Sequence, residues 1–254
     1  MMEIYNEPVG RVWGPWATVG FGLVIGVVSL VVQVIAVIVV LAVNFDADPG
    51  ISPDEFYQEI LSVLGLCTAI ASIASAVIGG GILIIVIVIR KGISITEYLG
   101  LKKISLKAVL VSLAVVIAII IAGDLTSFVL GRQINADFMI QIYNTSVYPV
   151  LLWLGIVVFA PLIEEAFFRG FMYAGFVNTR LGVTGTVLLT SLVWTSLHAV
   201  QYGIYELTIL FVTGIILGFA RHKTGSLWAP LLMHSVMNAL AMLEVAININ
   251  SLVG

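Results

Sequence analysis

The sequence predicts an all-α fold, a polytopic bundle of transmembrane helices. Hydrophobic residues make up 61% of the 254 residues and charged residues only 10%, and the mean hydropathy is +1.16. A soluble domain of average composition has about 25% charged residues. The apolar residues form runs of roughly 20 or more, the length that an α-helix needs to cross a bilayer. The short alternating segments of a membrane β-barrel are absent from the sequence.

Seven apolar segments are predicted to cross the membrane, within a range of six to eight. They cover residues 17–43, 60–89, 106–131, 147–178, 183–199, 204–221 and 226–247. A crossing takes about 20 helical residues, so the fifth and sixth segments are close to the minimum, whereas the second and fourth are longer than required. Three consecutive glycines, residues 79–81, could divide the second segment and leave an eighth crossing open.

Lysine and arginine residues predict the orientation of these segments. With seven crossings, nine of the eleven basic residues fall on one side: Arg11, Arg90, Lys91, Lys102, Lys103, Lys107, Arg180, Arg221 and Lys223. Arg132 falls on the other side and Arg169 lies within a span, and the loop of residues 44–59 is acidic. Because basic residues favour the cytoplasmic side, we expect an integral protein of a prokaryotic plasma membrane with a cytoplasmic N-terminus.

Residues 92–107 connect the second and third segments and combine leucine and isoleucine with lysine. Such a stretch can lie on the cytoplasmic surface of the lipid bilayer, with its apolar side chains buried and its lysines directed at anionic headgroups. A plain loop fits the same residues. The bilayer is thus the first predicted partner, and nothing in the sequence indicates nucleic acid.

Three charged residues lie within the fourth apolar segment, at positions 164, 165 and 169. Each charge at this depth costs about 2.5–3.5 kcal/mol, so their presence predicts a use. Glu165 and Arg169 are four residues apart and can pair on one face of a helix. Glu164 projects about 100° away from Glu165, which leaves it available for proton exchange.

Two later segments place histidines within apolar surroundings. Trp194 and His198 share a face of the fifth segment, so the indole can cover one side of the imidazole. His234 and Asn238 share a face of the seventh segment in the same way. Together with Glu164 they supply a base for a water nucleophile and donors for an oxyanion, which water attack on an amide requires.

Each of these residues also has a simpler structural interpretation. A single buried histidine is more often a packed, hydrogen-bonded residue than a catalyst, and Glu164 could form an interhelical hydrogen bond or serve proton-coupled transport. Transporters of that kind contain inverted repeats with interrupted helices, and no repeat is recognisable in the sequence. Three polar motifs in successive segments favour the catalytic interpretation.

The three motifs resemble those of the CAAX-protease and bacteriocin-processing (CPBP or Abi) family of intramembrane endopeptidases, which is related to the type II CAAX prenyl endopeptidases. The family pattern consists of Glu-Glu-Xaa3-Arg, then aromatic-Xaa3-His, then His-Xaa3-Asn or His-Xaa3-Asp. In this chain the motifs run from Glu164 to Arg169, from Trp194 to His198 and from His234 to Asn238. The resemblance covers about residues 160–240, and it departs from the pattern at Trp194, where phenylalanine is usual.

The resemblance implies a role for each of these residues. Glu164 and His198 would activate a water molecule, and His234 and Asn238 would stabilise the oxyanion. Supporting roles are implied for Glu165, Arg169 and Trp194. No cofactor is expected. Zinc is the alternative, with Glu164, His198 and His234 as ligands, but the base would then have to be Glu165, which Arg169 can neutralise.

We therefore expect a single transmembrane domain, residues 1–254. Within it, residues 1–145 would form the N-terminal spans and the interfacial loop, and residues 146–254 the catalytic core. The predicted function is that of an intramembrane endopeptidase that hydrolyses a peptide bond of a lipidated or amphipathic peptide or protein substrate. A non-catalytic immunity or assembly factor of the same fold is the alternative.

Overall fold

The computed structural model describes residues 12–45, 50–131 and 137–253, with side chains described up to residue 247. Residues 46–49 of the acidic loop, Arg11 and Arg132 lie outside these ranges, so their predicted placement stays a prediction. Within the described ranges the chain contains helices and no strands. The helices are α1 (Pro15–Asn44), α2 (Pro53–Ser62), α3 (Leu64–Val88), α4 (Ile95–Leu99), α5 (Leu106–Leu130), α6 (Asp137–Asn144), α7 (Pro149–Trp153), η1 (Leu154–Phe159), α8 (Ala160–Glu165), η2 (Ala166–Met172), α9 (Tyr173–Phe176), α10 (Gly182–Ser196), α11 (Ile204–Thr224) and α12 (Trp228–Val253).

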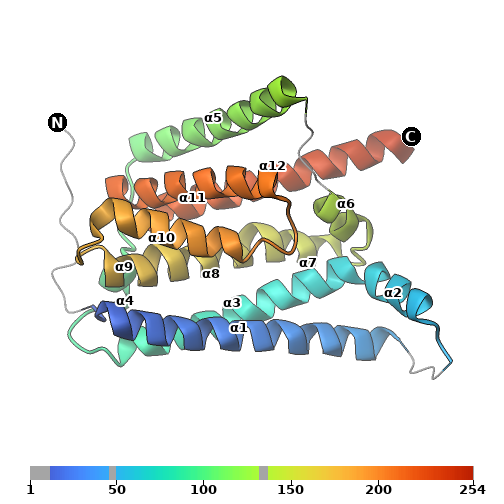
Figure 1. Cartoon of the computed structure of the whole chain (residues 1–254), viewed down its shortest axis with the longest axis horizontal. Helices are drawn as coiled ribbons and strands as arrows, with labels where there is room; N and C mark the ends of the chain where they lie inside the picture. The colour runs from blue at the N-terminus through green and yellow to red at the C-terminus, as the bar shows by residue number, and fades with distance from the viewer. Residues whose placement is uncertain (1–11, 46–49, 132–136, 254) are drawn as a thin grey trace.

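Six helical stretches among the described residues are long and apolar enough to cross a membrane. They are α1, α3, α5, the composite helix Pro149–Phe176, α11 and α12, and they confirm the predicted polytopic bundle. The fifth predicted segment forms α10, whose 15 residues extend only about 22 Å at 1.5 Å per residue. It is therefore too short to cross the roughly 30 Å hydrocarbon core alone. It nevertheless packs along α11 within the bundle (Figure 1).

The three glycines of the second segment do not divide it. The helix α3 continues through residues 79–81, and the break lies instead at Val63, between α2 and α3. A Cβ atom added at Gly79 would lie 2.5 Å from Ser29 Oγ, so this glycine permits close packing of α3 against α1. The eighth crossing that the glycines left open is not formed.

The connection of residues 92–107 packs on the protein in its central part. Its central part forms α4, in which Tyr98 and Leu99 are buried against the core that includes Phe171. The helix ends at Gly100, whose φ of +68° is left-handed, and Gly100 O accepts a hydrogen bond from Leu227 N at 2.9 Å. Leu99 therefore packs in the protein core and the start of α12 holds this connection to the bundle, whereas the position of the connection on the bilayer surface stays a prediction.

The helix of Pro149–Phe176 includes two π-helical stretches, η1 and η2, on either side of α8. Pro161, in the first turn of α8, has no N–H for the backbone ladder and follows η1 directly. A wider π turn accommodates such an interruption, and π turns occur often at functional sites. The two glutamates lie at the end of α8, between the two π turns.

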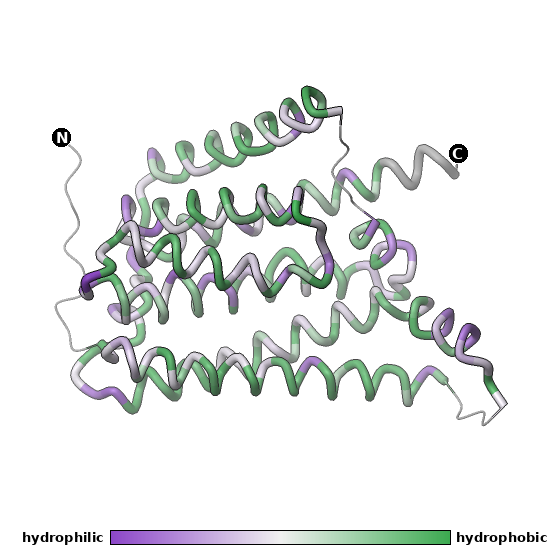
Figure 2. Tube along the Cα trace, in the orientation of Figure 1, coloured by the Kyte–Doolittle hydropathy of each residue, from purple (hydrophilic) through white to green (hydrophobic). Residues whose placement is uncertain are grey.

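The composite helix lies near the centre of the bundle (Figure 1). The pair α1 and α3 packs on one side of it, α10 and α11 pack together, and α12 contacts α5 at the edge. Figure 2 shows mainly apolar residues along α1 and α5 and more polar residues along the central helices. Since the outer helices would face lipid, the polar side chains are gathered where neighbouring helices can satisfy them.

Candidate functional site

A buried ion pair forms the base of the candidate site. Arg169 Nη1 donates a hydrogen bond to Glu165 Oε1 at 2.9 Å, and both side chains are 0% exposed. This is the pairing that the four-residue spacing predicts. Arg169 Nη2 also donates to Gly214 O, in α11, at 3.2 Å. The arginine thereby joins the composite helix to α11 and partly offsets the burial cost of Glu165.

His234 is oriented by the same carboxylate. Its Nδ1 lies 2.9 Å from Glu165 Oε1, and since a carboxylate accepts, Nδ1 carries the hydrogen. The other ring nitrogen, Nε2, lies 4.0 Å from Glu164 Oε2. Glu165 therefore fixes both Arg169 and His234 and turns the free nitrogen of His234 toward Glu164.

Glu164 differs from its neighbour in exposure and in partners. Its side chain is 26% exposed, whereas that of Glu165 is fully buried. Its Oε2 accepts a hydrogen bond of 2.5 Å from Trp194 Nε1. The two glutamates thus have separate environments, as their different directions on the helix predict, and Glu164 is the more accessible carboxylate.

Trp194 forms the centre of the aromatic part of the site. It is 2% exposed, and the Arg169 Cζ atom lies 4.8 Å from its ring centroid, within the range of a cation–π interaction. Its ring contacts His198 at a centroid distance of 5.0 Å and His234 at 5.5 Å, both edge to face. One indole therefore contacts both histidines and both charged partners of the site, Glu164 and Arg169.

His198 lies in the turn that follows α10 and is half-buried. Its Nδ1 lies 3.0 Å from Trp194 O, and since a carbonyl accepts, Nδ1 is the donor and Nε2 keeps a lone pair. In the described part of the chain, His198 forms no hydrogen bond with Glu164 or His234. Its connection to the rest of the site passes through Trp194.

Asn238 is held by a carbonyl that the first π turn leaves unpaired. Ala160 N bonds to Gly155 O, five residues back, so the next N–H in that register would come from residue 161, which is proline. Ile156 O therefore lacks a backbone donor, and Asn238 Nδ2 donates to it at 2.9 Å. One amide hydrogen of Asn238 remains for another acceptor.

The second π turn is satisfied in a similar way by Arg221. Tyr173 N bonds to Phe168 O rather than to Arg169 O, its partner in α-helical register. Arg221 Nε donates to Arg169 O at 3.1 Å, and the Arg221 side chain is buried. Sequence reasoning assigned Arg221 only to the cytoplasmic charge count, because the π turn that creates its acceptor has no marker in the sequence.

A second residue that the sequence analysis missed is Tyr202, in the connection between α10 and α11. Its ring lies over His198 with a centroid distance of 6.4 Å and an interplanar angle of 24°. The spacing of four residues from His198 was a possible signal, although the connection is not a regular helix. Tyr202 therefore belongs to the surroundings of the candidate site.

The side chains of the alternative zinc site are those of Glu164, His198 and His234. Across residues 12–45, 50–131 and 137–247, no three His, Cys, Asp or Glu side chains are grouped so that they could hold an ion. The Nδ1 atoms of His198 and His234 are engaged by Trp194 and Glu165, which leaves both Nε2 atoms available, as in metal-ligating histidines. No step of the mechanism below passes through a metal.

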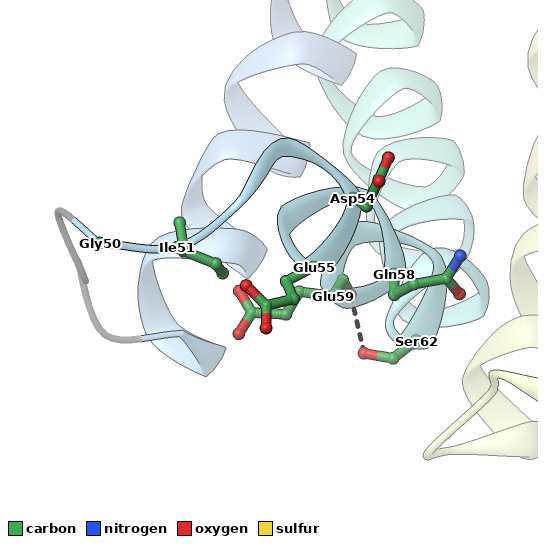
Figure 3. Close-up of a pocket in the computed structure, with 7 residues that line it drawn as sticks. All are labelled: Gly50, Ile51, Asp54, Glu55, Gln58, Glu59 and Ser62. Atoms are coloured by element: carbon green, nitrogen blue, oxygen red, sulfur yellow. Dashed lines mark hydrogen bonds between the residues drawn. The ribbon is translucent and has the colours of Figure 1, made fainter.

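A separate pocket lies at one end of the bundle, on α2 (Figure 3), and its lining includes Asp54, Glu55 and Glu59. Glu55 serves its own helix there, since Ser52 N donates to its carboxylate at 3.0 Å. Hydrogen bonds from the Ser52 backbone and side chain lower the pKa of Glu55. Glu55 thus caps the N-terminus of α2. Figure 1 places α2 away from the middle of the composite helix.

The fold and the buried cluster define a class, that of polytopic helical membrane proteins with a polar site enclosed between their helices. Residues 146–240 match the family described as "Type II CAAX prenyl endopeptidase Rce1-like". This match confirms the family resemblance predicted from the three motifs, and the family is one of membrane peptidases. All seven candidate site residues lie within the matched range.

A curated relative supports a shorter stretch of similarity. An Escherichia coli protein named "Uncharacterized 24.3 kDa protein" is 32% identical over 123 residues, which are 46% of this chain and 56% of that protein. The chain thus spans little more than half the length of this relative. No solved structure matches the chain.

Proposed function

We propose that the protein is an intramembrane endopeptidase that hydrolyses a peptide bond of a lipidated or amphipathic substrate by a metal-free, glutamate-based mechanism. The observation that carries the proposal is the separation of two adjacent glutamates. Glu165 is fully buried and paired with Arg169, whereas Glu164 is 26% exposed and faces His234 Nε2 at 4.0 Å. Glu164 is an accessible carboxylate beside the buried ion pair of Glu165 and Arg169, and such a carboxylate is suited to general-base catalysis.

In the first step, Glu164 takes a proton from a water molecule as the water oxygen attacks the carbonyl carbon of the scissile peptide. His198 assists, because its Nδ1 donates to Trp194 O and its Nε2 can accept a hydrogen bond from the same water. The indole N–H of Trp194 holds the Glu164 carboxylate in place. Orientation of the base and the nucleophile lowers the entropic part of the barrier.

The attack places a negative charge on the former carbonyl oxygen. His234 stabilises this oxyanion through an Nε2 hydrogen in its imidazolium form, in which Nδ1 still donates to the Glu165 carboxylate. The remaining amide hydrogen of Asn238 is the second donor. Glu164 then returns its proton to the amide nitrogen as the C–N bond breaks, which releases an amine and a carboxylic acid and restores the site.

The test uses purified wild-type protein, Glu164→Gln and the exposed control Asp54→Asn in liposomes. Each is incubated with a peptide farnesylated at a C-terminal CAAX box and with amphipathic leader peptides, and the products are identified by mass spectrometry. We expect cleavage by the wild type and by Asp54→Asn and none by Glu164→Gln. Equal cleavage by Glu164→Gln would refute the assignment of the base. Capture of a peptide without cleavage by any of the three would favour the non-catalytic alternative.

A further inference from the structure

Tyr202 covers the side of the candidate site that His198 forms. Its ring is stacked on His198, and its edge meets Phe138, in α6, at a centroid distance of 6.3 Å and an angle of 75°. Its backbone N–H donates to His198 O at 3.2 Å. The ring is therefore held between an imidazole of the site and an apolar neighbour.

The hydroxyl of Tyr202 has no hydrogen-bond partner among the described residues, although the residue is only half-exposed. A buried tyrosine usually pairs its hydroxyl, so the hydroxyl of the partly buried Tyr202 is available to a peptide that binds beside it. Burial, the Glu206 carboxylate and the Glu164 carboxylate raise the pKa of Tyr202, in that order of effect. The phenol stays protonated at neutral pH and is available as a donor rather than as a base.

The chemistry of the site leaves room for such a donor. The Nδ1 hydrogen of His234 is given to Glu165 and one amide hydrogen of Asn238 to Ile156 O. A peptide bound at Glu164 presents a carbonyl oxygen that gains charge during attack and flanking carbonyls that also accept hydrogen bonds. The two assigned donors can serve only part of this demand.

We propose that the Tyr202 hydroxyl donates a hydrogen bond to the peptide substrate at the carbonyl group under attack, so that Tyr202 is a further catalytic residue of the site. This inference rests on the proposed peptidase function. The ring is stacked on His198, which would hold the water, so a peptide positioned for attack by that water lies beside Tyr202. A donor to the developing oxyanion acts mainly in the transition state, so its removal lowers kcat more than it raises KM.

The test compares Tyr202→Phe with the wild type and with Tyr148→Phe, whose ring is 57% exposed. The Phe substitution keeps the ring on His198 and removes only the hydroxyl. We expect kcat to fall about 100- to 1,000-fold, with KM changed less than about threefold. The fold-change should be constant from pH 6 to 9, since the raised pKa keeps the phenol neutral over that range. The melting temperature should not change, because the hydroxyl has no hydrogen-bond partner to lose among the described residues.

An unchanged kcat in Tyr202→Phe would overturn the proposal. A fall in activity that is accompanied by a fall in the melting temperature would also overturn it. Glu164→Gln in the same assay separates this failure from that of the proposed function. If Tyr202→Phe is fully active while Glu164→Gln is inactive, the peptidase function stands and only the role of Tyr202 is refuted. If Glu164→Gln cleaves like the wild type, both proposals are refuted, since the donor has no reaction at Glu164 to assist.

Discussion

The two adjacent glutamates should respond in opposite ways to the same conservative substitution. Glutamine keeps the shape of glutamate and removes its charge. At position 165 the charge is fully buried and binds Arg169 and His234, each at 2.9 Å. At position 164 the side chain is 26% exposed, and its one described hydrogen bond, from Trp194 Nε1, can be accepted equally by an amide oxygen.

These contacts set the expected magnitudes. Removing one partner of a buried ion pair costs about 3–5 kcal/mol, because the remaining charge stays buried without compensation. For Glu165→Gln the remaining buried charge is that of Arg169. The amide NH₂ group of the new glutamine would take the place of Glu165 Oε2, where no hydrogen-bond partner is available among the described residues. At about 2–4 °C per kcal/mol for a chain of this size, the melting temperature should fall by roughly 6–20 °C. Glu164→Gln should change the stability by less than about 1 kcal/mol.

The assay is thermal unfolding of both variants in the same detergent, followed by intrinsic tryptophan fluorescence, with the peptide-cleavage assay run in parallel below the unfolding transition. We expect Glu165→Gln to unfold early and Glu164→Gln to unfold with the wild type but without activity. Equal melting temperatures for the two variants would contradict the assignment of Glu165 as the structural carboxylate. An early transition in Glu164→Gln alone would reverse the two roles.

Two further predictions follow from the packing and the ligand geometry. A Cβ atom at Gly214 would lie 3.0 Å from Ser191 Cβ and 3.2 Å from Trp194 Cε3. The variant Gly214→Ala should therefore displace the indole that holds Glu164 and lower the cleavage rate about 10-fold. The control Gly26→Ala, where an added Cβ atom would have no atom within 4 Å, should cleave like the wild type. Treatment with 1,10-phenanthroline should leave the cleavage rate unchanged, and loss of activity that added Zn²⁺ restores would refute the metal-free mechanism.

The pairing within the site was predictable from the sequence where it depends on helical spacing alone. The contact of Glu165 with Arg169 needs four residues of regular helix and nothing else. The contact of Trp194 with His198 was predicted from the same spacing, although His198 lies in the turn that follows α10. The lengths of the apolar runs also predicted the segments that form the six long helices, because a helix needs about 20 apolar residues to cross a bilayer.

The contacts that cross between helices were not predictable from spacing. The partners of Asn238 and Arg221 are carbonyls freed by π turns, and π register depends on how neighbouring helices pack. The stacking of Tyr202 on His198 depends on the path of an irregular connection. The short length of α10 was missed because Leu197 and Ala199 prolong the apolar segment predicted over residues 183–199, although the helix ends at Ser196.

The π turns also explain how a polar site can be rigid in lipid. Helices in a bilayer associate without a strong hydrophobic driving force, so side-chain contacts must fix their relative positions. An unpaired backbone carbonyl in this setting costs several kcal/mol. Since Asn238 of α12 and Arg221 of α11 satisfy Ile156 O and Arg169 O, neither helix can slide along the composite helix without paying that cost. The same displacement would break the contacts of Arg169 with Gly214 O and of His234 with Glu165. The interruptions of the composite helix therefore stabilise the alignment of the three helices on which the proposed chemistry at Glu164 depends.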